Sequence, residues 1–329
     1  MDKLINYMNL LKVGSSTDTY PIYAQYINSD GKCARTCKDD IFVKVDCSLP
    51  FIGSTNIFVL DSILKTLTDY SVTQEGADIC IKSGNFNTKL STMDIPFPNI
   101  DEPSIPLVYI DEEVHLMLKI ASQFVSQNDI YENIIITKGG ICSTRGTRAF
   151  LWNKKFEIED SILINKKILS TLEVGRFVGV DENNNTVVKF DGGYIVAESD
   201  NANDFAYEKL ASFISDAKSK SISNRVCSVI QMQSALEKLA PIFFGEKSRY
   251  VYMFSDGNKL NIKAETINGV AEVDIEPDTD IKFEITMSMD FFRGLPPYSM
   301  YIEGRGTLSY LYFTDDSNMV DIVLLGTKG

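Results

Sequence analysis

Ser62-Ile63-Leu64-Lys65-Thr66-Leu67 is the first of three similar six-residue phrases in this chain. The second is Lys167-Ile168-Leu169-Ser170-Thr171-Leu172, and the third is Asp290-Phe291-Phe292-Arg293-Gly294-Leu295. Each phrase has the apolar spacing expected at the end of an amphipathic helix. The phrases begin at residues 62, 167 and 290, so neighbouring phrases lie about one domain length apart. Self-similarity at this spacing indicates a fold built from repeated units.

Two alternating, strand-like runs follow each phrase, and a short turn joins them. Alternation of apolar and polar residues on both sides of a Gly-, Asn- or Asp-containing turn is typical of an antiparallel hairpin. The predicted strand pairs are residues 78–82 with 87–91, 186–190 with 194–197, and 308–313 with 320–325. The last of these hairpins closes the given sequence.

A second set of three helices is predicted from apolar residues at i, i+3, i+4 and i+7. Strand-like runs follow these helices too, such as residues 133–137 and 249–254. The apolar stripes are Leu4, Tyr7, Met8 and Leu11; Val114, Met117, Leu118, Ala121, Phe124 and Val125; and Val229, Met232, Leu236, Leu239, Ala240 and Phe243. The sequence therefore predicts six helix-plus-strands modules.

Short connections between the predicted strands favour antiparallel pairing over parallel crossovers, which indicates the α+β class. A chain of 329 residues has room for about three domains. The Pro-rich residues 96–106 and the polar residues 217–224 are the predicted linkers. We therefore predict domains at residues 1–104, 105–220 and 221–329, with two modules in each.

The net charge is −13, with 45 acidic residues against 32 Lys and Arg. Taken alone, this balance argues against a nucleic-acid-binding protein, because neutralising phosphates requires cations. Every predicted helix nevertheless carries a cation on the face opposite its apolar stripe. These residues are Lys3, Lys12, Lys65, Lys119, Lys166, Lys167, Lys238 and Arg293. Two interpretations remain open: a shared DNA-binding surface, or the lysines that any solvent-exposed helix face carries.

No known catalytic pattern is present in the sequence. His115 is the one histidine, so a Ser-His-Asp or Cys-His nucleophile system would have to use it. Neither phosphate-binding glycine motif occurs. The acidic run Asp111-Glu112-Glu113 is at a predicted helix start, where acids are favoured regardless of function. We predict a protein without catalytic activity and without a cofactor, and keep a hydrolase that uses scattered acids as the enzyme alternative.

The six cysteines are scattered, and only Cys33 and Cys37 are close in sequence. A second pair, which a zinc site would need, is missing, so no metal site is predicted. No apolar run approaches the roughly 20 residues of a membrane helix, and the N-terminus has no signal-peptide pattern. We expect reduced thiols in a cytoplasmic protein with no membrane contact.

Several segments carry a resemblance to one known protein family. Residues 78–93, with Ser83-Gly84-Asn85-Phe86 and Leu90-Ser91-Thr92, followed by Pro96-Phe97-Pro98-Asn99-Ile100-Asp101, resemble the end of that family's first domain. The helix containing Ala121-Ser122-Gln123-Phe124 is similar to the helix that opens its second domain. Thr144-Arg145-Gly146-Thr147-Arg148-Ala149 stands where the family has T-D-G-H-R-L, with Arg145, Thr147 and Ala149 substituted. In these segments the chain resembles the bacterial β-type DNA sliding clamps.

The resemblance implies three clamp domains per chain, with helices lining the interior of a ring and antiparallel sheets outside. It implies a homodimer that encircles double-stranded DNA, in a bacterial or phage-infected cell. It also implies a pocket for short peptides of the DNA polymerase and the clamp loader. The matching pocket positions are Thr144, Gly146, Thr147, Arg148, Ala149, Phe205, Tyr207, Lys209, Leu210, Val323, Leu324 and Leu325.

Alternatives remain for these residues and for the whole chain. Leu324 and Leu325 have the character of core residues in a last strand, and Arg148 has many acids with which to pair. The three substitutions in the turn motif put the peptide preference in doubt. The competing function is a monomeric protein of the same fold that binds replication factors without encircling DNA.

Overall fold

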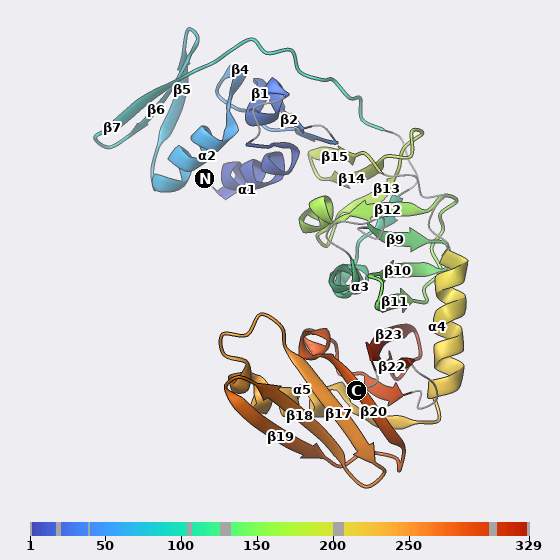
Figure 1. Cartoon of the computed structure of the whole chain (residues 1–329). Coiled ribbons are helices and arrows are strands. Elements are labelled where there is room, and N and C mark those ends of the chain that lie inside the picture. Colours follow the sequence, from blue (N-terminus) through green and yellow to red (C-terminus); the bar gives the residue numbers. More distant parts are fainter. Residues whose placement is uncertain are drawn as a thin grey trace. The chain divides into compact units, whose positions relative to one another are not determined.

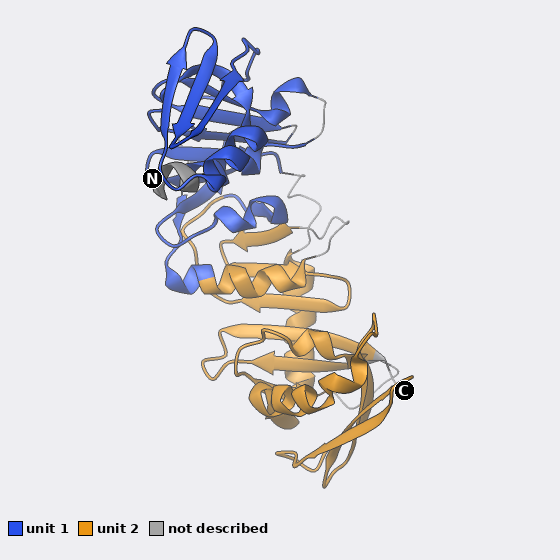
Figure 2. Ribbon diagram, turned by 90° about the vertical axis from the view of Figure 1, so that its left-hand side faces the viewer, with its two compact units in different colours: residues 1–115, 160–202 blue, residues 116–159, 203–329 orange. Residues whose placement is uncertain are grey.

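The computed structural model describes residues 2–17, 21–38, 40–103, 107–125, 133–199, 207–302 and 308–327. The chain divides into two compact units, residues 1–115 with 160–202 and residues 116–159 with 203–329 (Figure 2). The predicted second domain, residues 105–220, is thus shared between the units. The three-domain boundaries therefore stay a prediction.

Unit 1 contains an eight-stranded antiparallel sheet in the order β4-β1-β2-β3-β15-β14-β13-β8 and a separate sheet β5-β6-β7 (Figure 1). Its helices are α1 (Asp2–Leu11), α2 (Ile57–Thr66) and the 3₁₀ helices η1 (Lys12–Gly14), η2 (Ile22–Gln25) and η4 (Lys166–Thr171). Its strands are β1 (Tyr26–Asp30), β2 (Ala34–Lys38), β3 (Ile41–Val45), β4 (Ile52–Asn56), β5 (Ser71–Glu75), β6 (Asp78–Ser83), β7 (Phe86–Ser91), β8 (Leu107–Tyr109), β12 (Ile162–Asn165), β13 (Phe177–Val180), β14 (Thr186–Phe190) and β15 (Gly193–Ala197).

Unit 2 contains the path β9-β10-β11-β23-β20-β17-β18-β19, with β22 and β21 continuing from β23 and β16 pairing with β21. Its helices are most of α3 (Glu112–Ala121), α4 (Tyr207–Ser221), α5 (Val229–Leu239), and the 3₁₀ helices η3 (Ser122–Phe124), η6 (Ala240–Phe243) and η7 (Met289–Phe292). Its strands are β9 (Asn133–Thr137), β10 (Gly140–Thr144), β11 (Arg148–Trp152), β16 (Arg225–Ser228), β17 (Tyr250–Asp256), β18 (Leu260–Thr266), β19 (Gly269–Ile275), β20 (Lys282–Ser288), β21 (Ser299–Ile302), β22 (Leu308–Thr314) and β23 (Val320–Thr327).

The predicted repeat and the α+β class are confirmed. All three predicted hairpins form, as β6–β7, β14–β15 and β22–β23. Each hairpin is preceded by a further strand, β5, β13 or β21, which the sequence did not predict. The four-strand modules also share one strand order, since β4-β1-β2-β3 and β20-β17-β18-β19 are equivalent paths.

The three phrases differ in helix type. The first lies at the end of an α-helix, whereas the second and third lie in the short 3₁₀ helices η4 and η7. All three helices begin with the same cap at the same place, directly after the fourth strand of a module. The side-chain oxygens of Asn56, Asn165 and Ser288 accept hydrogen bonds from the backbone N–H two residues later, at 3.1, 2.9 and 3.3 Å. Such caps satisfy donors that have no partner in the first turn.

Two strand joints connect the modules into larger sheets. In unit 1, β3 pairs with β15, from Ile41 opposite Ala197 to Val45 opposite Gly193. In unit 2, β11 pairs with β23, from Arg148 opposite Leu324 to Trp152 opposite Val320. A Cβ at Gly193 would lie 2.4 Å from the carbonyl oxygen of Lys44, so the first joint requires glycine there.

Each unit places its module helices on one face of its sheet, and a connecting segment covers the other face. In unit 1, Thr36 of β2 donates to the Leu11 carbonyl of α1, whereas Tyr194 of β15 donates to the Ile100 carbonyl from the opposite face. In unit 2, Phe124 and Phe292 of η3 and η7 stack on Phe150 and Phe313. Helix α4 lies on the opposite face of this sheet, where Lys218 binds Asp321.

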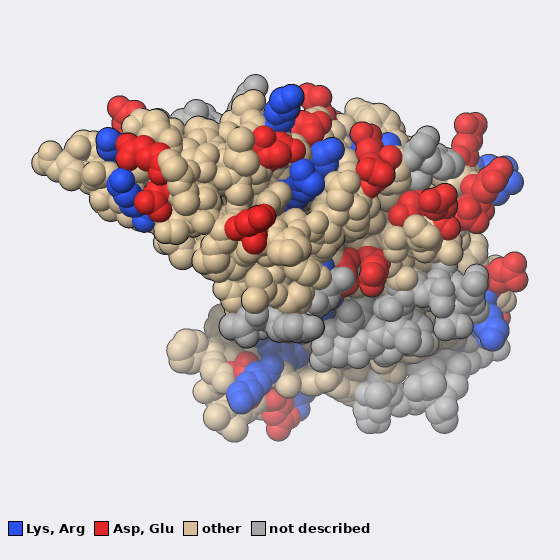
Figure 3. Space-filling view, turned by 90° about the horizontal axis from the view of Figure 1, so that it is seen from above, with Lys and Arg blue, Asp and Glu red and all other residues tan. Residues whose placement is uncertain are grey.

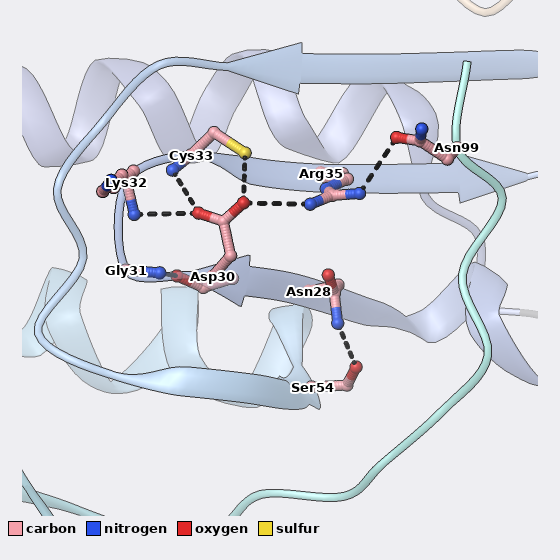
Figure 4. Close-up of polar contacts among 9 residues, drawn as sticks. Asn28, Asp30, Gly31, Lys32, Cys33, Arg35, Ser54 and Asn99 are labelled. Carbon is pink, nitrogen blue, oxygen red and sulfur yellow. Dashed lines mark hydrogen bonds and ion pairs between the residues drawn. The ribbon is translucent and has the colours of Figure 1, made fainter. Parts of the chain in front are cut away.

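The segment after β7 is fastened to unit 1 through the β1–β2 hairpin (Figure 4). The Asp30 carboxylate accepts hydrogen bonds from the backbone N–H groups of Lys32 and Cys33, and from Arg35 at 3.0 Å. Arg35 in turn donates to Asn99 Oδ1 at 3.1 Å. Hydrogen bonds from Cys33 and Lys32 hold the pKa of Asp30 far below its usual value. The described part of the predicted linker, residues 96–103, is therefore a strap held against the sheet at Asn99 and Ile100.

All six cysteines are buried, and none of them forms a disulfide. Within the described ranges, no helix has both the length and the apolar character needed to cross a membrane.

Candidate nucleic-acid and peptide interfaces

The cations predicted to bind DNA lie on or beside the module helices. Lys12 is in η1, Lys65 in α2, Lys166 and Lys167 in η4, Lys119 in the last turn of α3, and Lys238 in the last turn of α5, while Arg293 directly follows η7. The backbone of Lys3 is in α1, and its side chain lies outside the described part of the structure.

Two of these lysines converge on one buried carboxylate. Asp61 of α2 is only 6% exposed, and its Oδ2 accepts from Lys12 Nζ at 2.7 Å and from Lys65 Nζ at 2.9 Å. Burial opposes ionisation of Asp61, but the hydrogen bonds from both lysines lower its pKa below the usual value. The hydrogen bond between Lys65 and Asp61 also raises the pKa of Lys65. A DNA phosphate would therefore have to compete with Asp61 for both ammonium groups.

Lys167 is also paired within the chain, to Asp40 in the β2–β3 turn. Lys119, Lys238 and Arg293 are exposed instead, and none of them is in an ion pair recorded for the described residues. Arg293 lines a cavity of about 350 Å³ between α5 and η7, which also contains Arg249, Glu237 and Asp290. In the view from above, blue cations likewise stand next to red acids (Figure 3). The cations therefore act within a mixed field, and their number alone overstates the attraction to DNA.

Replacing Asp61 with Asn is expected to strengthen DNA binding, because it releases Lys12 and Lys65. The slope of log K against log salt should steepen by about 1–2, since each added phosphate contact on duplex DNA contributes roughly 0.9. Fluorescence anisotropy with a labelled duplex at several salt concentrations measures this slope. The matched control is Asp216→Asn, which breaks the Lys220–Asp216 pair of α4 on the opposite sheet face. An equal change in both variants would mean that net charge alone acts.

The predicted peptide site is built around a tight turn between β10 and β11. Arg145 and Arg148 exchange backbone hydrogen bonds of 2.9 and 3.3 Å, and Thr144 donates its hydroxyl to the Arg148 carbonyl. Gly146 has φ +56°, a conformation that L side chains rarely adopt. The Thr147 carbonyl accepts from the Leu325 N–H at 2.8 Å, which ties the turn to β23. The turn is therefore held rigidly against the last strand.

The structure divides the predicted pocket residues between two faces of the β11–β23 joint. Arg148 and Leu324 are directly opposite and share the helix face, since they alternate with Asp321 and Val323 on the α4 face. The Arg148 guanidinium stacks 3.9 Å from the Phe291 ring centroid, and its burial lowers the pKa of Arg148. Leu324 is fully buried. The core interpretation of Leu324 agrees with this burial, and Arg148 contacts an aromatic ring.

The α4 face brings the other pocket residues together. Ala149 and Val323 are opposite each other there, and Leu325 is opposite Tyr310. Leu325 and Leu210 are half-buried, whereas Lys209 is exposed. Phe213 of α4 stacks on Tyr310 with ring centroids 6.2 Å apart. Phe205 lies outside the described residues.

Sequence reasoning missed α4, whose last residues fall within the predicted polar linker at residues 217–224. The signal was present, since Leu210, Phe213, Ile214 and Ala217 follow the i, i+3, i+4, i+7 rule. Helix α4 is fixed through a buried polar group: Asp321 accepts from Lys218 at 3.1 Å, from Asn153 at 2.9 Å and from the Tyr312 hydroxyl. Phe213 and Tyr310 are thus site residues that only the structure identifies.

His115 has a structural explanation. Its Nδ1 lies 2.7 Å from the Leu172 carbonyl oxygen, which can only accept, so Nδ1 carries a proton and ties α3 to the end of η4. Asp111 caps α3 by accepting from the Val114 N–H at 2.7 Å, as predicted for this acidic run. The described residues also contain no group of three or more potential metal ligands.

Solved structures of similar architecture identify this arrangement. The chain superposes on the β sliding clamp of Caulobacter crescentus with a TM-score of 0.81 at 14% identity, over 99% of this chain and 96% of that one. The chain has the DNA sliding-clamp fold. The DNA polymerase sliding clamp of Bacillus subtilis gives a TM-score of 0.79 at 14% identity over 100% and 97% of the two chains. The DNA polymerase III β subunit of Pseudomonas aeruginosa gives 0.78 at 15% over 100% and 98%.

Neither a family model nor a curated protein sequence matches the chain. The resemblance drawn from short, altered motifs is therefore confirmed at the level of the sliding-clamp fold, where sequence comparison finds no relative. At 14–15% identity the likeness establishes this fold, and the activity follows only from the site and its tests.

Proposed function

We propose that the chain is a DNA sliding clamp: two copies close head to tail into a ring that encircles duplex DNA and tethers a DNA polymerase. The observation that carries this proposal is an unfinished third joint. Two four-strand modules are joined through their third strands to the last strand of a hairpin module, as β3–β15 and β11–β23. The third module ends in β19 and the remaining hairpin in β7, and each of these strands has one partner among the described residues.

The register of the β3–β15 joint can be applied to a joint between β19 and β7. The hairpins that end in these four strands, β2–β3, β14–β15, β18–β19 and β6–β7, all have two-residue loops. The pairs that close these loops are Lys38–Ile41, Phe190–Gly193, Thr266–Gly269 and Ser83–Phe86. In β3–β15, the first residue of each strand is opposite the fifth of the other. Applied to β19 and β7 of a second copy, this rule puts Gly269 opposite Leu90, Ala271 opposite Thr88 and Val273 opposite Phe86.

This register is supported by the faces that it brings together. Thr88 and Leu90 share a face with the buried Ile81 and Ile79 of β6. Ala271 and Val273 share a face with the buried Ala264 and Ile262 of β18. The two apolar faces therefore become continuous in this register. A slip by one residue would put them on opposite sides of the joined sheet. On the other face, Lys89 comes diagonal to Glu272, within reach for an ion pair.

A cysteine pair tests this joint directly. We expect Ala271→Cys combined with Thr88→Cys to give a disulfide-linked dimer on mild oxidation, because opposite residues of paired strands lie about 4.5–5.5 Å apart at Cα, within disulfide range. Non-reducing gel electrophoresis measures the product. The matched control is Ala271→Cys with Asn87→Cys, whose side chain lies on the other face of β7. Equal cross-linking in both variants, or none in a dimeric protein, would contradict the register.

The proposed role is mechanical and needs no catalytic group from this chain. A closed ring keeps its polymerase near the primer end by raising its effective concentration. Retention on circular DNA at high salt, with loss from linear DNA, distinguishes a ring from electrostatic binding, which salt weakens steeply. A monomeric mass at high concentration would instead favour a protein that binds replication factors without encircling DNA. Metal-dependent cleavage lost on mutating an acidic cluster would favour a hydrolase.

We propose that the α4 face of the β11–β23 joint, including Leu325, Leu210 and Phe213, receives short peptides of the polymerase and clamp loader. Leu325→Ala is expected to weaken binding of a polymerase C-terminal peptide by roughly tenfold, about 1.4 kcal/mol, with little change in melting temperature. Leu324→Ala should instead cost about 2–5 kcal/mol of folding stability, because Leu324 is 0% exposed. Isothermal titration and thermal melting separate the two. Peptide affinity that is unchanged in Leu325→Ala would contradict this site.

A further inference from the structure

The sheet β20-β17-β18-β19 exposes an aromatic row on the face opposite to α5. Tyr250, Tyr252 and Phe254 alternate along β17 with Val251 and Met253, which are fully buried. Tyr250 is 59% exposed and Phe254 43% exposed. A solvent-facing antiparallel strand normally presents polar residues at such positions. Large exposed aromatic side chains in a row therefore indicate a contact surface.

Carboxylates surround this row. Phe254 is opposite Glu284 of β20, and on the other side opposite Asn261, which is itself opposite Asp274. Tyr252 is opposite Lys263, which is itself opposite Glu272. We call this surface the aromatic–acidic face. Its members are Tyr250, Tyr252, Phe254, Lys263, Glu265, Glu272, Asp274 and Glu284.

The charges on this face are incompletely neutralised. Lys263 binds Glu265 at 2.8 Å, and Lys259 from the β17–β18 turn binds Asp274 at 3.2 Å. Glu272 and Glu284 form no ion pair among the described residues, although Asn261 donates to Glu272 at 3.4 Å. A depression of about 270 Å³ lined by Tyr250, Tyr252, Lys263, Glu265 and Thr286 lies over the aromatic row. The surface is therefore apolar along its centre and negative at its margins.

Aromatic residues at the centre of the equivalent faces are covered. Tyr194 is 2% exposed beneath the strap that contains Ile100, and Tyr312 is 0% exposed on the α4 face of its sheet. No described segment lies over Tyr250 or Phe254 in this way. The aromatic–acidic face is thus a sheet surface that no described segment covers at Tyr250 and Phe254.

We propose that the aromatic–acidic face binds an arginine-rich segment of a partner protein. Guanidinium groups stack on aromatic rings and pair with carboxylates through a planar fork, and this face offers both in alternation. Phosphates are repelled by the excess of carboxylates, so a nucleic acid does not fit. The inference goes beyond the proposed ring, because the face lies away from α5 and only Glu272, on its β19 margin, is near the proposed β19–β7 joint.

Fluorescence anisotropy with labelled octa-arginine and octa-lysine peptides at low salt tests the proposal. We expect wild type to prefer octa-arginine, and Tyr250→Ala with Phe254→Ala to weaken its binding about five- to tenfold, the size of two exposed cation–π contacts. Tyr250→Leu with Phe254→Leu keeps apolar side chains but should weaken binding equally. Thermal melting monitored by circular dichroism confirms that the variants are folded.

Two acid pairs provide a control for general charge. Glu272→Gln with Glu284→Gln should weaken octa-arginine binding, whereas Glu157→Gln with Glu159→Gln removes the same charge from exposed residues elsewhere and should not. Equal weakening in both pairs, or wild-type affinity in the Ala or Leu variants, would overturn the proposal. So would self-association in sedimentation, or binding of an oligonucleotide, that the Tyr250 and Phe254 variants abolish.

Discussion

Phe86→Asp is expected to convert the proposed dimeric ring into monomers. Phe86 is 41% exposed in the single chain and, in the proposed register, faces Val273 of the second copy. Burying a carboxylate there should cost about 2 kcal/mol or more per joint, roughly 30-fold in affinity. A closed dimer has two such joints, so the loss is about a thousandfold in all. Analytical ultracentrifugation measures the mass, and primer extension measures the accompanying loss of processivity.

The control for this variant is Phe254→Asp. Phe254 is 43% exposed, and it also lies on a strand of an antiparallel sheet, but away from either edge strand of the proposed joint. The two substitutions therefore introduce the same charge at equally exposed phenylalanines. Dimers that survive in Phe86→Asp, or dissociate equally in Phe254→Asp, would refute the β19–β7 joint while leaving the fold unaffected.

Reversing three exposed cations, Lys119→Glu, Lys238→Glu and Arg293→Glu, is expected to abolish processive synthesis by a ring that still forms. These side chains are the least compensated of the predicted DNA contacts. Losing three contacts should reduce the salt slope of DNA binding by about 3 and the affinity by roughly 100-fold, at about 1 kcal/mol for each charge. Anisotropy with a duplex and primer extension on a long template measure both effects.

The matched control reverses Lys155, Lys259 and Lys282, three exposed lysines that belong neither to the predicted DNA contacts nor to the predicted peptide pocket. It changes the net charge by the same amount, so any shared loss reports the global field of an acidic protein. Unchanged processivity in the first variant would contradict the assignment of the module helices to the DNA side.

The surface that carries the predicted DNA-binding cations is less positive than the number of its lysines suggests, because Asp61 pairs with two of them. A sequence shows Lys12 and Lys65 on polar helix faces, because helical periodicity is local. It does not show that Asp61 lies between them, since that contact joins η1 to α2 across 49 positions. Charge compensation is thus a tertiary property, even where each helix is predictable.

The pocket residues illustrate the same division. Strand β23 was predictable from its apolar run, but Val323, Leu324 and Leu325 alternate between two faces, and only the pairing with β11 shows which face each one meets. No helix is predicted around Leu210 and Phe213, and the predicted linker, residues 217–224, overlaps the end of that segment. The structure makes it helix α4, which is held by the buried Asp321.

By itself, the sequence determined the α+β class, the repeat and the three hairpins, because these depend on local periodicity and turn residues. It also indicated the fold through short motifs, although identity to solved clamps is only 14–15%. The tertiary structure alone decided the third strand beside each hairpin, the two module joints and the pairing of cations with acids. These depend on which segments, distant along the chain, form hydrogen bonds with one another, and no local pattern encodes that choice.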